Sequence, residues 1–331
     1  MRNALLCLLS IPAIALAQNS AGIDLINFAP SDTQILAGGN VASAKNSPFG
    51  QFVLSHMQLG GSQFQKFISE TGFDPRTDLT EGLIASTGIP KSSTRMLVAA
   101  HGSFSLAMAT VEGALVNDGA TINHLPGVDV IQLPSATGDH APPPNCIAFF
   151  TDGATALAGD CSIVEAGAQS KGAAPSAPPA LVAKAEQWKK QDDVWFTSIV
   201  PLTQFLGGMP KIGPLSGIAN TDVFKAIQQT TGGVKFTIST AQGPGIQISG
   251  EAVMDSAQNA TSLLNVINFL ESMIKMAQPG GPGIGIGSIV TVLSTLQASA
   301  AGNVVSVNLT IPETTLEQFF NAPPLAHAAA W

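Results

Sequence analysis

Histidine is the residue type best suited to acid–base chemistry or metal binding at neutral pH, and this chain has five. Their spacing forms none of the patterns HxH, HxxxH or HExxH, so no metal site and no cofactor are predicted. His101 ends a predicted strand and His124 lies in a predicted hairpin, so the two could meet in space. The plainer interpretation is that each is an ordinary surface or partly buried histidine.

Other catalytic patterns are equally weak. No G-x-S-x-G elbow occurs, although a serine, a histidine and an acid from distant segments could still assemble. Asp74 and Asp78 flank Arg76, which is more typical of a capped turn with a surface ion pair than of paired acid–base carboxylates. The glycine-rich run 283–288 follows a long predicted helix and lacks the GK[ST] of a phosphate loop, so it is interpreted as a flexible connection. No catalytic residue is predicted.

Two cysteines, Cys146 and Cys161, flank two apolar runs joined by an Asp-Gly pair at 152–153. This pattern predicts a β-hairpin whose outer ends carry the cysteines, and therefore a disulfide. Closing a loop of about 15 residues would add roughly 3 kcal/mol to stability. The alternative is a pair of free buried thiols. A CxxC redox or metal motif is excluded by the spacing.

The N-terminus predicts export. Arg2 precedes an apolar run over residues 4–17, and Ala15 and Ala17 place small residues at the −3 and −1 positions of a cleavage site. We therefore expect a signal peptide over 1–17, and a periplasmic or secreted protein whose oxidising surroundings permit the disulfide. The alternative, an N-terminal anchor helix, needs about 20 apolar residues. Cys7 lies inside the apolar run and should leave with the peptide.

The composition makes two classes of binding partner unexpected. Charged residues make up 11%, well below the usual quarter or so, and the formal net charge is −8 at pH 7. Nucleic acids and anionic lipids reward clustered Lys and Arg, so neither is an expected partner. No later segment is predicted to span a membrane. The oligomeric state is left open.

One order of predicted elements occurs twice, at a near-constant offset. In the first half it consists of a strand at 34–38, a helix at 63–71 and strands at 83–87 and 95–101. The second half has a strand at 193–199, a helix at 222–230 ended by Gly232-Gly233, and strands at 235–240 and 245–252. The repetition predicts a duplicated unit; the alternative is an ordinary α+β chain whose elements fall in phase.

The most regular predicted helix covers residues 256–276. Its apolar side chains recur at spacings of three and four, which indicates one broad apolar face packed across a sheet. The plainer interpretation is a core helix. The sharper one is a wall of an apolar ligand cavity.

The predicted fold class is α+β, with two similar lobes, each a mainly antiparallel sheet with helices on one face. The lobes are expected at 18–170 and 180–320, joined by a linker at 171–179 and followed by a flexible tail at 321–331. Three functions fit this layout. The first is a non-catalytic envelope protein that binds a hydrophobic ligand or a protein partner. The others are a hydrolase with a site assembled from distant segments, and an assembly component acting by sheet-edge pairing.

Two sequence motifs in the first half also resemble those of a protein family. Asn46-Ser47-Pro48-Phe49-Gly50-Gln51 and Thr71-Gly72-Phe73-Asp74-Pro75-Arg76-x-Asp78-Leu79 resemble an uncharacterised family of exported bacterial proteins. The resemblance covers the chain to about residue 158. It implies bacterial export and an α+β fold, and it carries no assigned activity and no functional residues.

Overall fold

A computed structural model describes residues 24–51, 68–69, 73–89, 94–104, 112–113, 115–117, 119–134, 144–201, 204, 221–240, 243–276, 292 and 294–316. The expected signal peptide, the glycine run at 283–288, the tail and most of the helix at 63–71 lie outside them. His56, His140 and His327 lie outside them as well.

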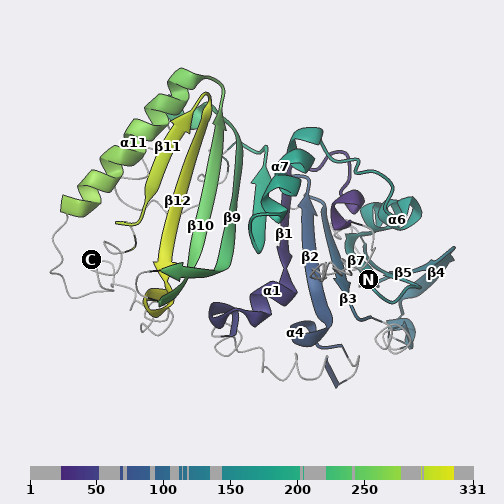
Figure 1. Cartoon of the computed structure of the whole chain (residues 1–331). Helices are drawn as coiled ribbons and strands as arrows, with labels where there is room; N and C mark the ends of the chain where they lie inside the picture. The colour runs from purple at the N-terminus through teal and green to yellow at the C-terminus, as the bar shows by residue number, and fades with distance from the viewer. Residues whose placement is uncertain are drawn as a thin grey trace, which may run out of the picture.

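The described strands form one twelve-stranded antiparallel sheet with the order β11-β12-β10-β9-β8-β1-β2-β3-β7-β6-β5-β4 (Figure 1). In chain order the strands are β1 (Ile35–Asn40), β2 (Leu79–Ser86), β3 (Met96–Gly102), β4 (Thr121–Leu125), β5 (Val128–Gln132), β6 (Asn145–Phe150), β7 (Thr155–Asp160), β8 (Val194–Ser198), β9 (Ile227–Thr240), β10 (Gly243–Met254), β11 (Gln297–Ala301) and β12 (Val304–Pro312).

Strand order repeats outward from the centre of the sheet. On one side of the β1–β8 pair the order is β1-β2-β3-β7-β6, and on the other it is β8-β9-β10-β12-β11. The three leading strands of each half are the ones that the sequence pattern matched. The halves do not form two separate sheets, however, because β1 and β8 pair directly from Ile35↔Ser198 to Gly39↔Val194. The β4–β5 hairpin extends the first half only.

The described helices are η1 (Leu25–Phe28), α1 (Val41–Asn46), α4 (Pro75–Asp78), α6 (Cys161–Ser170), α7 (Pro179–Lys189), α10 (Asp222–Lys225) and α11 (Ala257–Met276). Side-chain caps begin several of them: the Asn40 side chain accepts from Ser43 N at the start of α1, and that of Asp160 accepts from Ser162 N at the start of α6. α6 ends at Ser170, and the capping residue Lys171 has a left-handed backbone with φ 45°.

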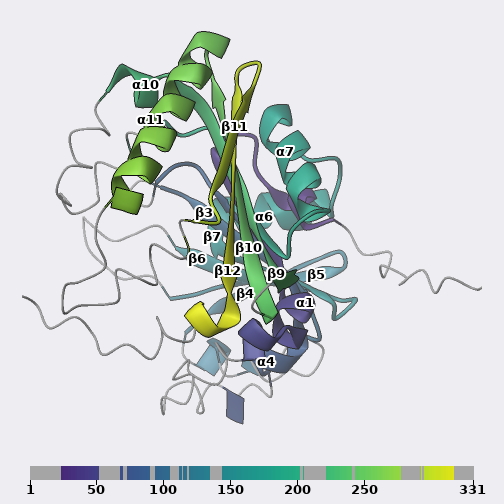
Figure 2. The same ribbon diagram turned by 60° about the vertical axis from the view of Figure 1, so that its left-hand side comes forward.

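Helices cover both faces of this single sheet, whereas the sequence predicted two lobes with helices on one face of each. η1, α6 and α7 pack on the face that carries Leu36, Leu97 and Trp195, and together they form the largest core cluster. α11 packs on the opposite face, against β10, β11 and β12. Figure 2 shows α11 and α7 on opposite sides of the sheet. No described helix is both long and apolar enough to cross a membrane.

The junction between the halves is tightly packed. Gly38 of β1 lies directly opposite Trp195 of β8, and a Cβ added at Gly38 would stand 2.5 Å from the Trp195 ring. The indole is buried, with 4% of its residue area exposed. Glycine at this position therefore lets the ring pack directly against β1.

Ion pairs tie α7 to the first half of the sheet. Lys189 Nζ lies 2.9 Å from Glu81 Oε1 and 3.1 Å from Asp24 Oδ1. Burial raises the pKa of the neighbouring Glu186 carboxyl, and the negative charge of Asp24 adds to that rise. Earlier in α7, Lys184 Nζ contacts Glu251 Oε2 of β10 at 2.6 Å.

The local predictions fare unevenly. The hairpins β4–β5 and β6–β7 and the helix α11 are confirmed within a residue or two. The helix expected at 222–230 is wrong: α10 ends at Lys225, and β9 begins at Ile227. β9 pairs with β8 on one side and β10 on the other, so these ladder hydrogen bonds outweigh a weak helical pattern. α6, α7 and β11 were not predicted.

Candidate functional site

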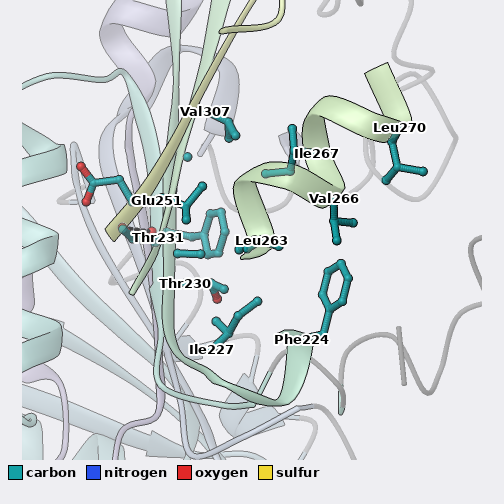
Figure 3. Close-up of a pocket in the computed structure, with 14 residues that line it drawn as sticks. Phe224, Ile227, Thr230, Thr231, Glu251, Leu263, Val266, Ile267, Leu270 and Val307 are labelled. Carbon is teal, nitrogen blue, oxygen red and sulfur yellow. Dashed lines mark hydrogen bonds between the residues drawn. The ribbon is translucent and has the colours of Figure 1, made fainter. Parts of the chain in front are cut away.

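An apolar cavity of about 430 Å³ lies between α11 and the sheet. Leu263 of α11 faces Ile227 and Thr230 of β9, and Val266 points toward Phe224 of α10 (Figure 3). The lining also includes Phe196 of β8, Gly250, Ala252, Ile267, Leu270, Val305 and Val307, together with the polar residues Thr231 and Glu251. The helix predicted as a possible cavity wall is thus one wall of this cavity.

Two glycines lie in the sheet beneath α11, and one of them, Gly250, lines the cavity. Gly232 of β9 and Gly250 of β10 lie directly opposite each other on the face that α11 covers. Neither has a side chain, so the sheet surface beneath the helix is lowered at two adjacent positions. A Cβ at Gly250 would meet Val307 Cγ2 at 3.2 Å, and one at Gly232 would meet Ser249 O at 2.7 Å.

The polar residues in the lining do not aim charge at the cavity. Side chains alternate between faces along a strand, so Glu251 and Thr231 point to the opposite face. In Figure 3 the Glu251 side chain points away from α11, where its carboxylate meets Lys184. Thr231 Oγ1 donates to Phe196 O at 2.9 Å. Thr230 is the remaining polar residue of the lining.

This chemistry suits hydrocarbon and little else. A carboxylate, phosphate or ammonium inside the cavity would lose its hydration without meeting a charged partner. An alkyl chain would lose only contact with water, which is favourable. The cavity lining contains no histidine, serine or cysteine, so no nucleophile with its base stands in its wall.

The histidines singled out from the sequence are not brought together. His101 Nδ1 lies 3.5 Å from Thr155 Oγ1 on β7, and the exposed His124 pairs with Asp129 across the β4–β5 hairpin at 2.6 Å. β3 and β4 are separated by β7, β6 and β5, which places the two strands roughly 19 Å apart at the usual strand spacing. Neither residue lines the cavity.

The acidic pair around Arg76 forms a capped turn. Asp74 accepts from Arg76 N and pairs with the guanidinium at 2.7 Å, while Asp78 Oδ2 accepts from Asp74 N at 2.7 Å. The hydrogen bonds from Arg76 lower the pKa of Asp74, which therefore stays ionised. Both carboxylates have structural partners here.

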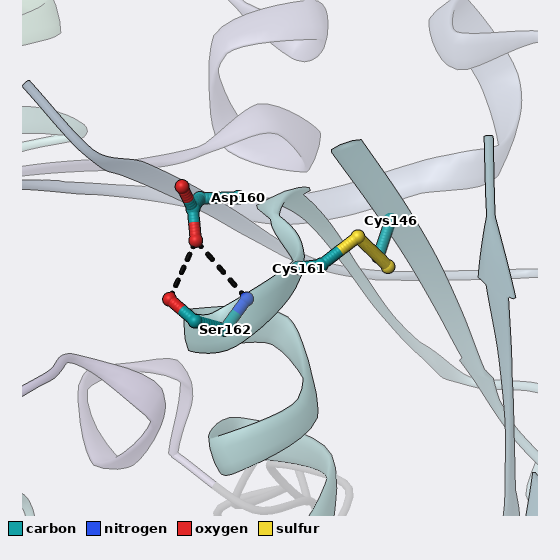
Figure 4. The surroundings of a disulfide bond; sticks show 4 residues. All are labelled: Cys146, Asp160, Cys161 and Ser162. Carbon is teal, nitrogen blue, oxygen red and sulfur yellow. Dashed lines mark hydrogen bonds between the residues drawn. A yellow bond between two sulfur atoms is a disulfide. The ribbon is translucent and has the colours of Figure 1, made fainter. Parts of the chain in front are cut away.

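The predicted disulfide between Cys146 and Cys161 is confirmed, with a Cα–Cα distance of 4.7 Å (Figure 4). It joins β6 to the first residue of α6, beside the Asp160 cap of that helix. Cys146 is 1% exposed and Cys161 is 8% exposed, so the bridge belongs to the core of the first half.

Among the described residues, no group of three or more His, Cys, Asp or Glu is placed to hold a metal ion. Comparisons with protein-family models, with curated proteins and with solved structures find no match to this chain.

The sequence singled out α11 but missed the floor of the cavity. A long amphipathic helix is visible as a three-and-four pattern, whereas the opposition of Gly232 and Gly250 depends on the β9–β10 register. Gly232 was the available signal. The pair Gly232-Gly233 predicts a helix end, whereas in the structure both residues lie inside β9.

Proposed function

We propose that this chain is an exported, non-catalytic protein that binds the hydrocarbon part of a hydrophobic ligand in the cavity beneath α11. The observation that carries the proposal is a cavity of about 430 Å³ whose inward-facing side chains are almost all apolar. An empty apolar cavity of this size forfeits packing contacts, and a bound hydrocarbon would restore them.

The size of the cavity sets the scale of binding. A methylene group is similar in size to a water molecule, which occupies about 30 Å³ in the liquid, so the cavity holds about 14 such units. Burying each methylene is worth about 0.8 kcal/mol, or about 11 kcal/mol in all. Association and ordering remove a large part of this, which leaves dissociation constants on the order of 1–100 μM.

The proposed export is consistent with this role. The chain begins with a signal-like segment, and its disulfide suits an oxidising compartment. A cavity that holds hydrocarbon away from water would let a poorly soluble molecule cross an aqueous envelope space. Fractionation of the native host, with the intact mass of the protein, tests export: the expected result is extracytoplasmic protein lacking residues 1–17.

The hydrolase alternative requires a pocket where His101 or His124 meets a serine and a carboxylate. The cavity described above contains neither histidine, so it lends that alternative no support. Sheet-edge assembly remains a prediction: β4 and β11 are the end strands of the described sheet.

Titration calorimetry with dodecanoate, kept below its micellar concentration, tests the proposed binding. Gly250→Val places a branched side chain in the cavity and should weaken binding at least tenfold. Gly82→Val is the matched control, because a Cβ at Gly82 meets no atom within 4 Å. It makes the same change in a strand of the same sheet but outside the cavity lining, so the affinity for this 12-carbon chain should be unchanged.

Two results would contradict the proposal: no binding of dodecanoate by the wild type, or equal binding by the wild type and a folded Gly250→Val variant. The melting temperature of each variant establishes that it is folded.

A further inference from the structure

One line of directly paired residues crosses the whole sheet, and every member is apolar. The line lies on the face that α11 covers and runs perpendicular to the strands. From β11 to β4 its members are Ala298, Val307, Gly250, Gly232, Phe196, Ala37, Ile84, Val98, Ala158, Ile147, Ile131 and Ile122. We call this line the apolar row.

The two ends of the apolar row are covered. At one end, Val307, Gly250 and Phe196 line the cavity beneath α11. At the other, Ile131 is fully buried, and Ile147 packs into the same aromatic cluster around Phe104.

The middle of the apolar row is open. Phe196 is 44% exposed, Ile84 43% and Val98 38%. Met96 and Ile248 lie on the same face and are also exposed, so the open stretch is wider than one residue. From Phe196 to Val98 the row crosses three strand spacings, about 14 Å. Exposed side chains of this size rarely gather in one line on a monomer without a partner.

Phe196 joins the open stretch to the cavity. Its ring is part of the cavity lining, and nearly half of the residue is exposed. It therefore stands at an opening of the cavity. Its cross-strand neighbour Ala37, and Ile84 on the next strand, continue the apolar surface away from α11.

We propose that this open stretch, from Phe196 to Val98, is an extension of the cavity that holds the outer part of one long, flexible alkyl chain. The proposal rests on the proposed function and specifies its ligand: a lipid with a chain longer than the cavity can hold. Its inner methylenes occupy the cavity, its outer methylenes lie along the apolar row, and its polar end remains in water.

The chemistry of the surface favours an alkyl chain over a peptide. The strands of the open stretch, β8, β1, β2 and β3, each pair with a neighbour on both sides, so their backbone groups are used in the sheet. A peptide lying across this face would desolvate its own N–H and C=O groups without finding partners, which is costly. An alkyl chain has no such groups.

Charge argues against a membrane surface as the occupant. The chain carries a net charge of −8, and the middle of the apolar row contains no basic residue. The anionic face of a bilayer attracts clustered Lys and Arg, so electrostatics would oppose docking there.

The test is a chain-length series of saturated fatty acids with 8 to 20 carbons, each titrated below its micellar concentration. The wild type should bind about fourfold more tightly per added methylene, and the rise should continue past the roughly 14 carbons that the cavity holds. The double variant Ile84→Thr/Val98→Thr keeps β-branched side chains, so its strands should persist. It should bind chains of 12 carbons or fewer normally and stop gaining affinity beyond about 14 carbons.

Val116→Thr is the matched control, since Val116 is 47% exposed and lies outside the apolar row. It should reproduce the wild-type series. Gly250→Val should weaken binding at every length.

The outcomes separate the two proposals. If no chain length binds, the proposed function fails. If short chains bind but the wild type already levels off near 14 carbons, the extension is wrong and the cavity remains. Equal losses at all lengths in the double variant would also overturn the extension. So would a double variant that keeps the long-chain gain but loses concentration-dependent dimers in light scattering, because the apolar row would then be an interface between copies.

Discussion

Replacing both bridged cysteines with alanine should cost about 3 kcal/mol of folding stability. The bridge closes a loop with a sequence separation of 15 residues. For a loop of about this length, the lost constraint on the unfolded chain corresponds to roughly 10 cal/mol/K, or about 3 kcal/mol at 25 °C. Alanine is preferred to serine because both sites are buried and a hydroxyl would need a hydrogen-bond partner.

The loss should appear in urea denaturation and as a lower melting temperature. One kcal/mol corresponds to about 2–4 °C for a chain somewhat shorter than this one, so the midpoint should fall by roughly 6–12 °C. Reductant added to the wild type should reproduce most of this fall and should leave the double alanine variant unchanged. Dodecanoate affinity at 25 °C should be the same in both proteins, because neither cysteine lines the cavity.

A loss below about 1 kcal/mol, with the bridge shown by mass to be present in the wild type, would refute this reasoning. It would mean that, in the unfolded chain, residual β6–β7 hairpin structure keeps positions 146 and 161 close together without the covalent bond. A fall in ligand affinity would contradict the placement of the cavity away from the bridge.

Two further predictions concern α7 and the β1–β8 junction. The pKa of the Glu186 carboxyl is near 4.5 in the unfolded chain and is raised in the folded chain, so the folded chain holds this proton more tightly. The contribution of Glu186 to stability therefore falls as the pH rises above about 4.5. Glu186→Gln should therefore be more stable than the wild type in urea at pH 7, an advantage that vanishes below about pH 4; a lasting advantage there would contradict the cause. Gly38→Ala should lower the free energy of unfolding by about 1–3 kcal/mol, since its Cβ would stand 2.5 Å from the Trp195 ring. The control Gly82→Ala should be nearly neutral, and equal losses in both would show that the clash is relieved elsewhere.

Much of the architecture could be predicted from local patterns. The β6–β7 hairpin follows from two apolar runs around Asp152-Gly153, and α11 follows from its three-and-four spacing. The duplicated order of strands was visible for the same reason, since each strand has its own local signal. What failed was the joining of the halves, because the pairing of β1 with β8 leaves no local mark in either segment.

The cavity and the apolar row could not be predicted because both depend on register. Gly232 and Gly250 are 18 positions apart in the sequence, and only the β9–β10 ladder places them side by side. Gly232-Gly233 also resembles a helix end. In the structure Gly233 instead leaves room for the Asp192 side chain, and Gly232 for the Phe196 ring. These packing constraints come from residues on other segments, so they cannot be predicted from the sequence of one strand alone.

Methyl NMR of the protein with bound dodecanoate tests the central claim most directly. Nuclear Overhauser contacts should connect the chain methylenes to the methyl groups of Leu263, Ile267 and Val307, which surround the cavity. Saturable binding whose contacts lie only elsewhere, for example at Ile163 or Leu181 on the opposite face of the sheet, would contradict the account.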